Sequence, residues 1–393
     1  MQPDHQLVQR RLSQLYFMTY LGPAVQSVYL PVWLEARGFN HHWIALLTSA
    51  GLLSSIFLST LFGRWADRQH DWGVAIRAGV LVGFLIGFVL LMPLTPLALF
   101  VVWVLYTLPT RLALPVLDAA AVRNANRLGL SFGAIRAWGT IGYVLMCLAA
   151  GAVLEFHGAG AFVWLLIGSM GLKLICTYRL PPLVKSPDAR AVQPAFWLSR
   201  NLSEALRPWL LLPLIGVLLI LSAHFPLYAF GALAWADAGI SATWIGLLVA
   251  IGSVFEAVLM FKFKHVLQRF SARGAMLFAG IVAVVRWIGL AMMPSLPVVI
   301  FLQALHAITF GVAFLAAFHF IANRIPDEVG AEAQSLFGVV QQLMCAALVM
   351  VFGATFTAFG TLSFGLSALS SAVGAGLIAI SLRQVGPQQE PVD

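Results

Sequence analysis

The stretch LSQLYFMTYLGPAVQSVYLPVWL, residues 12–34, indicates the class of fold. It contains 23 consecutive uncharged residues and directly follows Arg10 and Arg11. A transmembrane helix needs about 20 predominantly apolar residues, so this stretch is long enough to cross a bilayer. A signal peptide has a shorter apolar core and a small-residue cleavage site, whereas Pro23 lies inside this run. We therefore expect a retained first transmembrane helix.

Apolar stretches of similar length fill most of the chain. Of its 393 residues, 61% are hydrophobic and only 10% are charged, against about 25% charged residues in a typical soluble domain. This composition predicts an all-α membrane protein with twelve transmembrane helices and no sizeable soluble domain. The expected spans are 12–34, 43–63, 74–92, 97–121, 130–153, 161–179, 208–233, 242–261, 274–292, 298–321, 333–355 and 362–382.

The longest connection divides the chain into two halves. Residues 180–207 are polar and contain proline, which predicts a cytoplasmic linker. We expect an N-terminal six-helix bundle over 1–179 and a C-terminal six-helix bundle with a short cytoplasmic tail over 208–393.

The two halves also resemble each other at an offset of 201 residues. A parallel repeat of six helices is the sequence trace of the major facilitator architecture, in which two bundles are related by a pseudo-repeat. The matches are Trp43-Ile44 with Trp244-Ile245, Gly51 with Gly252, Arg68 with Arg269, Gly73 with Gly274, and Pro93 and Pro96 with Pro294 and Pro297.

The basic residues predict the orientation of the chain. If the N-terminus is cytoplasmic, 19 of the 23 Lys and Arg residues fall in cytoplasmic loops or at cytoplasmic helix ends. Arg37 alone lies outside, and the remaining three are inside helices. Positive residues concentrate on the cytoplasmic side, so both termini are expected there. The formal net charge of +8 then reflects topology, and we expect no nucleic-acid partner.

The cysteines and other reactive residues indicate neither an enzyme nor a cofactor. Cys147, Cys176 and Cys345 all lie in apolar runs, a pattern that fits neither a disulfide framework nor a metal cluster. The sequence has no nucleophile motif and no phosphate-binding loop. We expect no cofactor and no metal, and a protein that functions as a monomer.

A loop motif follows the second expected helix. Gly63-Arg64-Trp65-Ala66-Asp67-Arg68 resembles the major facilitator motif Gly-x-x-x-Asp-Arg. Gly63 would allow close helix approach, and Asp67 with Arg68 would hold one conformation closed by capping or ion pairing. The usual trailing Gly-Arg-Arg is replaced by Gln69-His70-Asp71. The alternative is a solvated charged turn.

Ionisable residues inside the expected helices are the main functional signal, because charge at bilayer depth is costly. Arg111 and Asp118 are seven residues apart and share a helix face, and Arg136 lies at a similar depth in the next helix. Asp118 and Arg136 form either a permanent salt bridge or a pair that opens on protonation or substrate binding.

Three residues are candidates for proton coupling: Glu256, Asp118 and His306. Glu256 has apolar neighbours, which favour a protonated carboxyl group. Its alternatives are a structural pair with Arg286 or a charge near the cytoplasmic helix end. His306 could instead be a packing residue. The candidates for substrate binding are Arg111, Arg136, Arg286, Trp138, Trp287, Gln26, Tyr20 and His224.

Several segments resemble the 3-phenylpropionate permease-like branch of the major facilitator superfamily, near the lactose permease and the nucleoside-proton symporters. The segments are Leu30–Leu34, Pro115–Ala119, Phe132–Gly139, Ser271–Arg273, Val285–Trp287 and Leu305–Ala307. Arg111 departs from that branch, where a small or apolar residue is expected.

The resemblance implies a secondary active transporter of the bacterial inner membrane. It favours proton-coupled uptake of a small organic solute, with an aromatic carboxylate as the leading class, by alternating access. The three intramembrane arginines outnumber Asp118 and Glu256, which also favours an anion. Sugar or nucleoside uptake is the second hypothesis. Drug efflux and a membrane sensor without transport are weaker alternatives.

Overall fold

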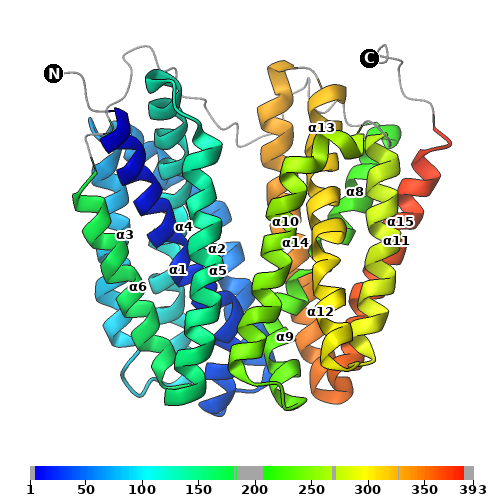
Figure 1. Ribbon diagram of the computed structural model, residues 1–393, viewed down its shortest axis with the longest axis horizontal. Coiled ribbons are helices and arrows are strands. Elements are labelled where there is room, and N and C mark those ends of the chain that lie inside the picture. Colours follow the sequence, from blue (N-terminus) through cyan, green and yellow to red (C-terminus); the bar gives the residue numbers. More distant parts are fainter. Residues whose placement is uncertain (1–4, 181–182, 184–206, 268–270, 326, 385–393) are drawn as a thin grey trace. The chain divides into compact units, whose positions relative to one another are not determined.

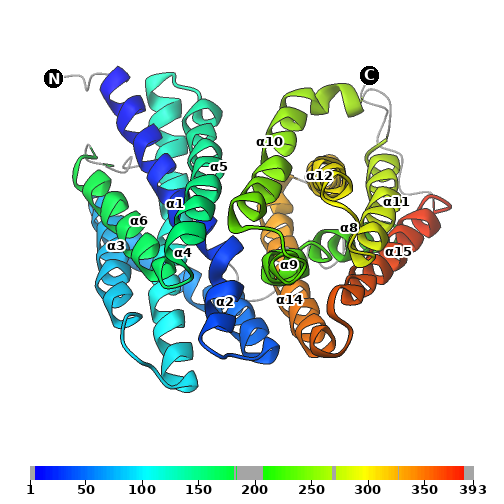
Figure 2. The same ribbon diagram turned by 60° about the horizontal axis from the view of Figure 1, so that its bottom comes forward.

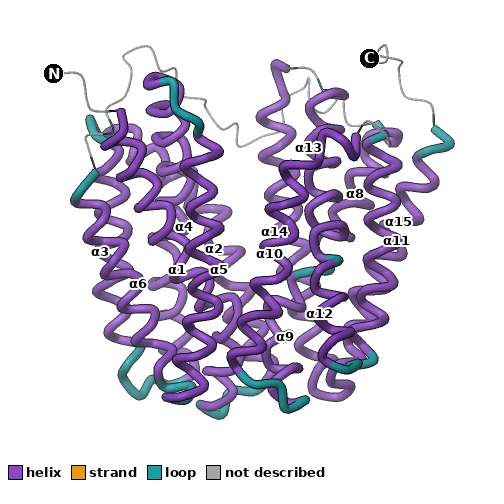
Figure 3. The backbone as a smooth tube through the Cα atoms, in the orientation of Figure 1, coloured by secondary structure: helices purple, strands orange, loops and turns teal. Residues whose placement is uncertain are grey.

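Almost every described residue of this computed structural model lies in a helix (Figure 3). The structure describes residues 5–180, 183, 207–267, 271–325 and 327–384. No strand is present in these ranges. The expectation of an all-α membrane protein is therefore confirmed.

The chain divides into two compact units. Unit 1 comprises Met1–Val192 and Trp235–Ala250, and unit 2 comprises Gln193–Ala234 and Ile251–Asp393. The segment Trp235–Ala250 thus belongs to unit 1, although in sequence it lies between the two parts of unit 2. The domain limits expected from sequence stay a prediction, because residues 184–206 of the linker lie outside the described part.

Unit 1 contains six long helices (Figure 1). Helix α1 packs against α5 and α6, α3 packs against α4 and α6, and α2 packs against α4. Glycines permit close approach: a methyl group at Gly79 of α3 would lie 2.8 Å from the carbonyl oxygen of Pro109 in α4. The helices are α1 (His5–Ala36), α2 (His41–Arg68), α3 (Trp72–Val89), α4 (Pro96–Leu128), α5 (Phe132–His157) and α6 (Ala161–Tyr178).

The helices of the second half repeat most of these pairings (Figure 2). Helix α8 packs against α14 and α15, and α11 packs against α13 and α15. The helices are α8 (Pro208–Ser222), α9 (Phe225–Asp237), α10 (Ala242–Leu267), α11 (Ala272–Ala291), α12 (Leu296–Ala304), the π-helix η1 (Ala307–Val312), α13 (Ala313–Arg324), α14 (Asp327–Phe359), the 3₁₀-helix η2 (Gly360–Ser363) and α15 (Phe364–Ser381).

The expected spans all fall on helices, but their count is not established by hydropathy alone. Within the described ranges, nine stretches are long and apolar enough to cross a membrane. One of them, Leu336–Ser381, runs through the last two expected spans because α14, η2 and α15 follow one another directly. The first two expected spans are the helices α1 and α2, which lie outside those nine stretches.

Candidate functional site

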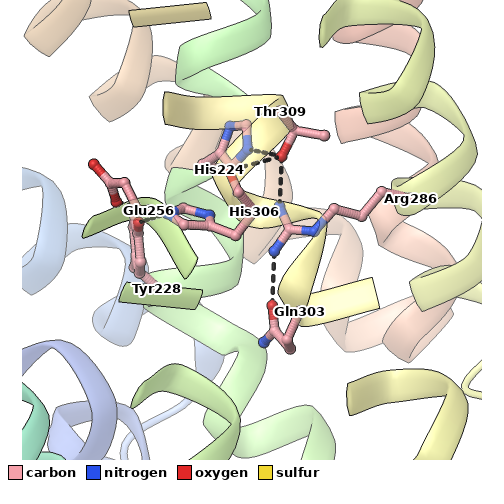
Figure 4. A network of polar contacts seen from close by, with 7 residues as sticks. All are labelled: His224, Tyr228, Glu256, Arg286, Gln303, His306 and Thr309. Atoms are coloured by element: carbon pink, nitrogen blue, oxygen red, sulfur yellow. Dashed lines mark hydrogen bonds and ion pairs between the residues drawn. The ribbon is translucent and has the colours of Figure 1, made fainter. Parts of the chain in front are cut away.

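In unit 2, a carboxylate and an imidazole meet inside the helical bundle (Figure 4). Oε2 of the half-buried Glu256, in α10, lies 3.4 Å from Nε2 of His306, which is 6% exposed. The hydroxyl of Tyr228, in α9, lies 3.3 Å from the same nitrogen. One ring nitrogen therefore faces both an acid and a phenol, an arrangement that can hold a proton between His306 and Glu256.

His306 lies where a helix changes its hydrogen-bonding pattern. Helix α12 ends at Ala304, and the π-helix η1 begins directly after His306. Single-turn π-helices occur frequently at functional sites. Gly252 of α10 faces this junction, because a methyl group there would lie 3.3 Å from Cβ of His306. The glycine allows α10 to bring Glu256 close to the imidazole.

Arg286 of α11 clamps this junction. Its Nη2 donates to Oε1 of Gln303 at 2.7 Å and its Nη1 to Oγ1 of Thr309 at 3.3 Å (Figure 4). Its Nε donates to the carbonyl oxygen of Leu302 at 2.8 Å. Leu302 and Gln303 precede the junction and Thr309 follows it. A buried charge is tolerated only when hydrogen-bonded, and Arg286 is 0% exposed. The guanidinium thus fixes the backbone around His306.

The sequence raised Glu256 as a partner for Arg286, and the structure gives both residues different partners. The pairs are Glu256 with His306, and Arg286 with neutral oxygen atoms. Trp287 follows Arg286 and is 0% exposed, with its ring 4.6 Å from the guanidinium carbon. Trp287 therefore packs against the clamp inside unit 2.

His224 of the α8–α9 turn joins the same network. Its Nδ1 lies 3.0 Å from the carbonyl oxygen of Ile220, so this nitrogen carries a hydrogen. Its Nε2 lies 2.9 Å from Oγ1 of Thr309. In the neutral ring, Nε2 accepts from the Thr309 hydroxyl, and the same oxygen accepts from Arg286. His224 is thus fully buried and hydrogen-bonded as a neutral side chain.

In unit 1, Asp118 and Arg136 have separate partners. The hydroxyl of Tyr16, in α1, donates to Oδ1 of Asp118, in α4, at 2.6 Å. The guanidinium carbon of Arg136, in α5, lies 5.4 Å from the ring centroid of Tyr20. No ion pair joins Asp118 to Arg136 in the part of the chain that the structure describes. The two charges that the sequence paired therefore contact different tyrosines of α1.

The remaining substrate-binding candidates differ in exposure. Arg111 of α4 is exposed, and its guanidinium lies beside Gly51 of α2. Gln26 of α1 is half-buried. Trp138 is 48% exposed on α5. None of these three joins the hydrogen-bonded network around His306.

The loop motif lies at the C-terminal end of α2. Gly63 is half-buried, and Arg68 is exposed as the last residue of the helix. The side chain of Asp67 lies outside the described residues. Asp71, three residues beyond the motif, pairs with Arg77 at 3.1 Å and accepts from the backbone N–H groups of Gly73 and Leu183 at 2.8 Å each.

Sequence reasoning missed three polar residues of these sites: Tyr16 as the partner of Asp118, and Gln303 and Thr309. Gln303 is a buried polar side chain within an apolar span, at 3% exposure, so its position alone was a usable signal. Thr309 gave no such signal, because threonine occurs widely in membrane helices.

Comparisons with known proteins place this chain in a family. The model of the MFS_1 like family matches residues 9–364. The chain belongs to the MFS_1 like family. It is 28% identical over 344 residues to the probable 3-phenylpropionic acid transporter of Escherichia coli K12, covering 87% of this chain and 89% of that protein. It is 24% identical over 315 residues to the maltose permease of Geobacillus stearothermophilus, covering 80% and 78%.

Solved structures of transporters share the fold. The nucleoside transporter NupG superimposes with a TM-score of 0.85 at 15% identity, covering 96% of this chain and 100% of that chain. A bacterial homologue of the lysosomal transporter Spinster gives a TM-score of 0.75 at 14% identity, covering 99% and 100%. The MFS_1 like chain is thus a multi-pass membrane protein of a transporter family, and the resemblance stated from sequence is confirmed.

Proposed function

We propose that this protein couples uptake of a small organic solute to proton entry by alternating access. The observation that supports this proposal best is the 3.4 Å contact between Glu256 and His306 within the membrane bundle. An acid and an imidazole at this distance exchange one proton between them, and their joint charge changes when a proton arrives or leaves.

Coupling follows from the cost of charge inside the bundle. With the site deprotonated, the Glu256 carboxylate is an uncompensated negative charge beside a neutral imidazole. A proton neutralises the pair, either as a carboxyl group or as an ion pair with His306. Conformations that bury this site are then favoured in the protonated form. Proton binding therefore biases the conformational equilibrium that carries the substrate.

Two observations favour an aromatic carboxylate as the substrate. The relative from Escherichia coli is named a probable 3-phenylpropionic acid transporter, and it aligns over most of both chains. The described helices also hold the exposed arginines Arg111 and Arg136. Sugar uptake is the second candidate, because the maltose permease and the raffinose permease of Escherichia coli also align with this chain.

The proposed setting is the bacterial inner membrane with both termini in the cytoplasm, and the monomer is the proposed working unit. The support for this orientation is the concentration of Lys and Arg in alternate loops.

A flux measurement tests the proposal. The purified protein is reconstituted into proteoliposomes with an internal pH dye, and aromatic carboxylates, sugars and nucleosides are added outside without an imposed gradient. We expect an aromatic carboxylate to acidify the interior faster than in protein-free liposomes, and a protonophore to abolish the difference in steady-state pH. Solute entry without acidification would contradict proton coupling, and acidification by a sugar alone would favour the second candidate.

A further inference from the structure

Arg111 differs from the other intramembrane arginines in having no protein partner. Arg286 donates to three oxygen atoms, and Arg136 lies over Tyr20. Within the described residues, no hydrogen bond or ion pair holds the guanidinium of Arg111. An arginine at this depth is costly unless it faces water or a partner. We therefore look for the partner of Arg111 in a bound ligand.

The position of Arg111 on α4 shows that it does not face lipid. It lies seven residues before Asp118, so the two side chains share a face over about two helical turns. Asp118 of that face binds Tyr16 of α1, whereas Pro109 and Ala113 pack against Gly79 of α3. Arg111 is thus an exposed residue on the side of α4 that faces α1 and α2 of unit 1.

Gly51 makes room for the guanidinium. A methyl group at Gly51 would lie 3.5 Å from Nη2 and 3.6 Å from Nε of Arg111, which is ordinary contact. Any larger side chain would take the space that the guanidinium occupies. The repeat-related Gly252 in unit 2 likewise faces an ionisable residue, His306, on the fourth helix of its half. In each half, the glycine at this repeat position leaves room for an ionisable side chain, which is an arginine in unit 1 and a histidine in unit 2.

We propose that Arg111 is the specificity-determining residue that binds the carboxylate of the substrate, and that Gly51 leaves the space that the guanidinium of Arg111 occupies. Arg111 is an exposed residue whose guanidinium has no acceptor within the described residues, and the planar fork of a guanidinium donates two parallel hydrogen bonds to a carboxylate. The ligand class is a monocarboxylate with an apolar body. This inference rests on the proposed function, because it names the chemistry of that substrate.

Equilibrium binding tests the inference independently of proton coupling. Calorimetry on the purified protein compares aromatic monocarboxylates, 3-phenylpropionate among them, with their matched primary amides. We expect the wild-type protein to bind a carboxylate at least about 10-fold more tightly than its amide, since a hydrogen-bonded charge pair contributes this much. Arg111→Gln removes that preference, so that the acid and its amide bind about equally. Arg111→Lys retains part of it, because the charge remains and the fork is lost.

Variants of the glycine keep the test specific. We expect Gly51→Leu to displace the guanidinium and abolish the preference, and Gly51→Ala to preserve it. Gly168→Leu on α6 is the matched control, because nothing lies within 4 Å of a methyl group there. Equal binding of acid and amide by the wild-type protein overturns the inference, as does a carboxylate preference that survives in folded Arg111→Gln. Carboxylate preference without proton flux would instead refute only the coupling.

Discussion

Thr309 holds two buried side chains through one hydroxyl group. Its oxygen accepts from Nη1 of Arg286, while its hydrogen is directed to Nε2 of the neutral His224. A protonated His224 would donate from Nε2 to the same oxygen, which already accepts from Nη1 of Arg286 at 3.3 Å. Both ring nitrogens of His224 are thus engaged within the protein, so the proposed proton carriers in unit 2 are Glu256 and His306.

Thr309→Val tests this residue. The substitution preserves shape but leaves a guanidinium N–H and an imidazole nitrogen without a partner in a buried site. The cost of such a loss is about 1–3 kcal/mol. We expect a lower apparent melting temperature of the purified protein, whereas Thr309→Ser keeps the hydroxyl and stays close to the wild-type value. An unchanged melting temperature in Thr309→Val would show that the network contributes nothing to stability.

A double-mutant cycle tests the pairing in unit 1. Because Tyr16 donates to Asp118 at 2.6 Å, we expect Tyr16→Phe and Asp118→Asn to be non-additive in thermal stability, with a coupling of about 0.5–3 kcal/mol. Asp118→Asn with Arg136→Gln is the comparison, and its effects are expected to be closer to additive. Stronger coupling between Asp118 and Arg136 than between Asp118 and Tyr16 would instead support the salt bridge that the sequence suggested.

At the residue scale, the sequence singles out ionisable residues inside apolar spans, but it does not reveal their partners. Glu256, His306, Arg286 and Asp118 stand out because charge is rare in apolar spans. Their partners depend on side-chain geometry across helices. A boundary error of two or three residues shifts a side chain by most of a helical turn, so partners a few ångströms apart could not be assigned from spacing.

Helices α8 and α15 meet through two glycines. A methyl group at Gly216 would lie 2.6 Å from the carbonyl oxygen of Gly374, and one at Gly374 would overlap the carbonyl oxygen of Gly216. The backbones therefore touch at this crossing, in the manner of small-residue interfaces in membrane helices.

Alanine at these glycines tests the crossing. Glycine to alanine inside a helix normally adds about 0.5–1 kcal/mol of stability through the unfolded state. At Gly216 and Gly374 the clash with backbone outweighs this gain, so we expect both variants to melt at lower temperature. Gly168→Ala on α6, with open space around it, is the control and is expected to be neutral or slightly stabilising. Stabilisation at all three positions would contradict the close crossing.

The elements themselves were predictable where hydropathy changes sharply. The proline-bounded turns at Pro93–Pro96 and Pro294–Pro297 separate the helices that the sequence places there. The π-helix η1 was not predictable, because it sits in an uninterrupted apolar span from Leu296 to Arg324 without an internal proline beyond Pro297. The contacts of Arg286 with Leu302 and Thr309 on either side of His306 are tertiary, and the spacing of residues in the sequence does not reveal them.

The basic residues predict the topology of the whole chain. Reporter fusions after Arg383 and within residues 180–207 are both expected to report a cytoplasmic location, because Lys and Arg concentrate in the loops on that side. The check is paired reporters that are active on opposite sides of the membrane. A periplasmic signal at either position would overturn the helix count or the orientation.

Glu256→Gln gives the most direct test of proton-coupled transport. The amide imitates a permanently protonated carboxyl group, so exchange of labelled for unlabelled substrate across proteoliposomes should persist, since exchange needs no deprotonation. Accumulation driven by a pH gradient should disappear. Glu35→Gln, at the exposed end of α1, is the matched control and should keep both activities. Gradient-driven accumulation retained in a well-folded Glu256→Gln protein would contradict the assignment of Glu256 as a proton carrier.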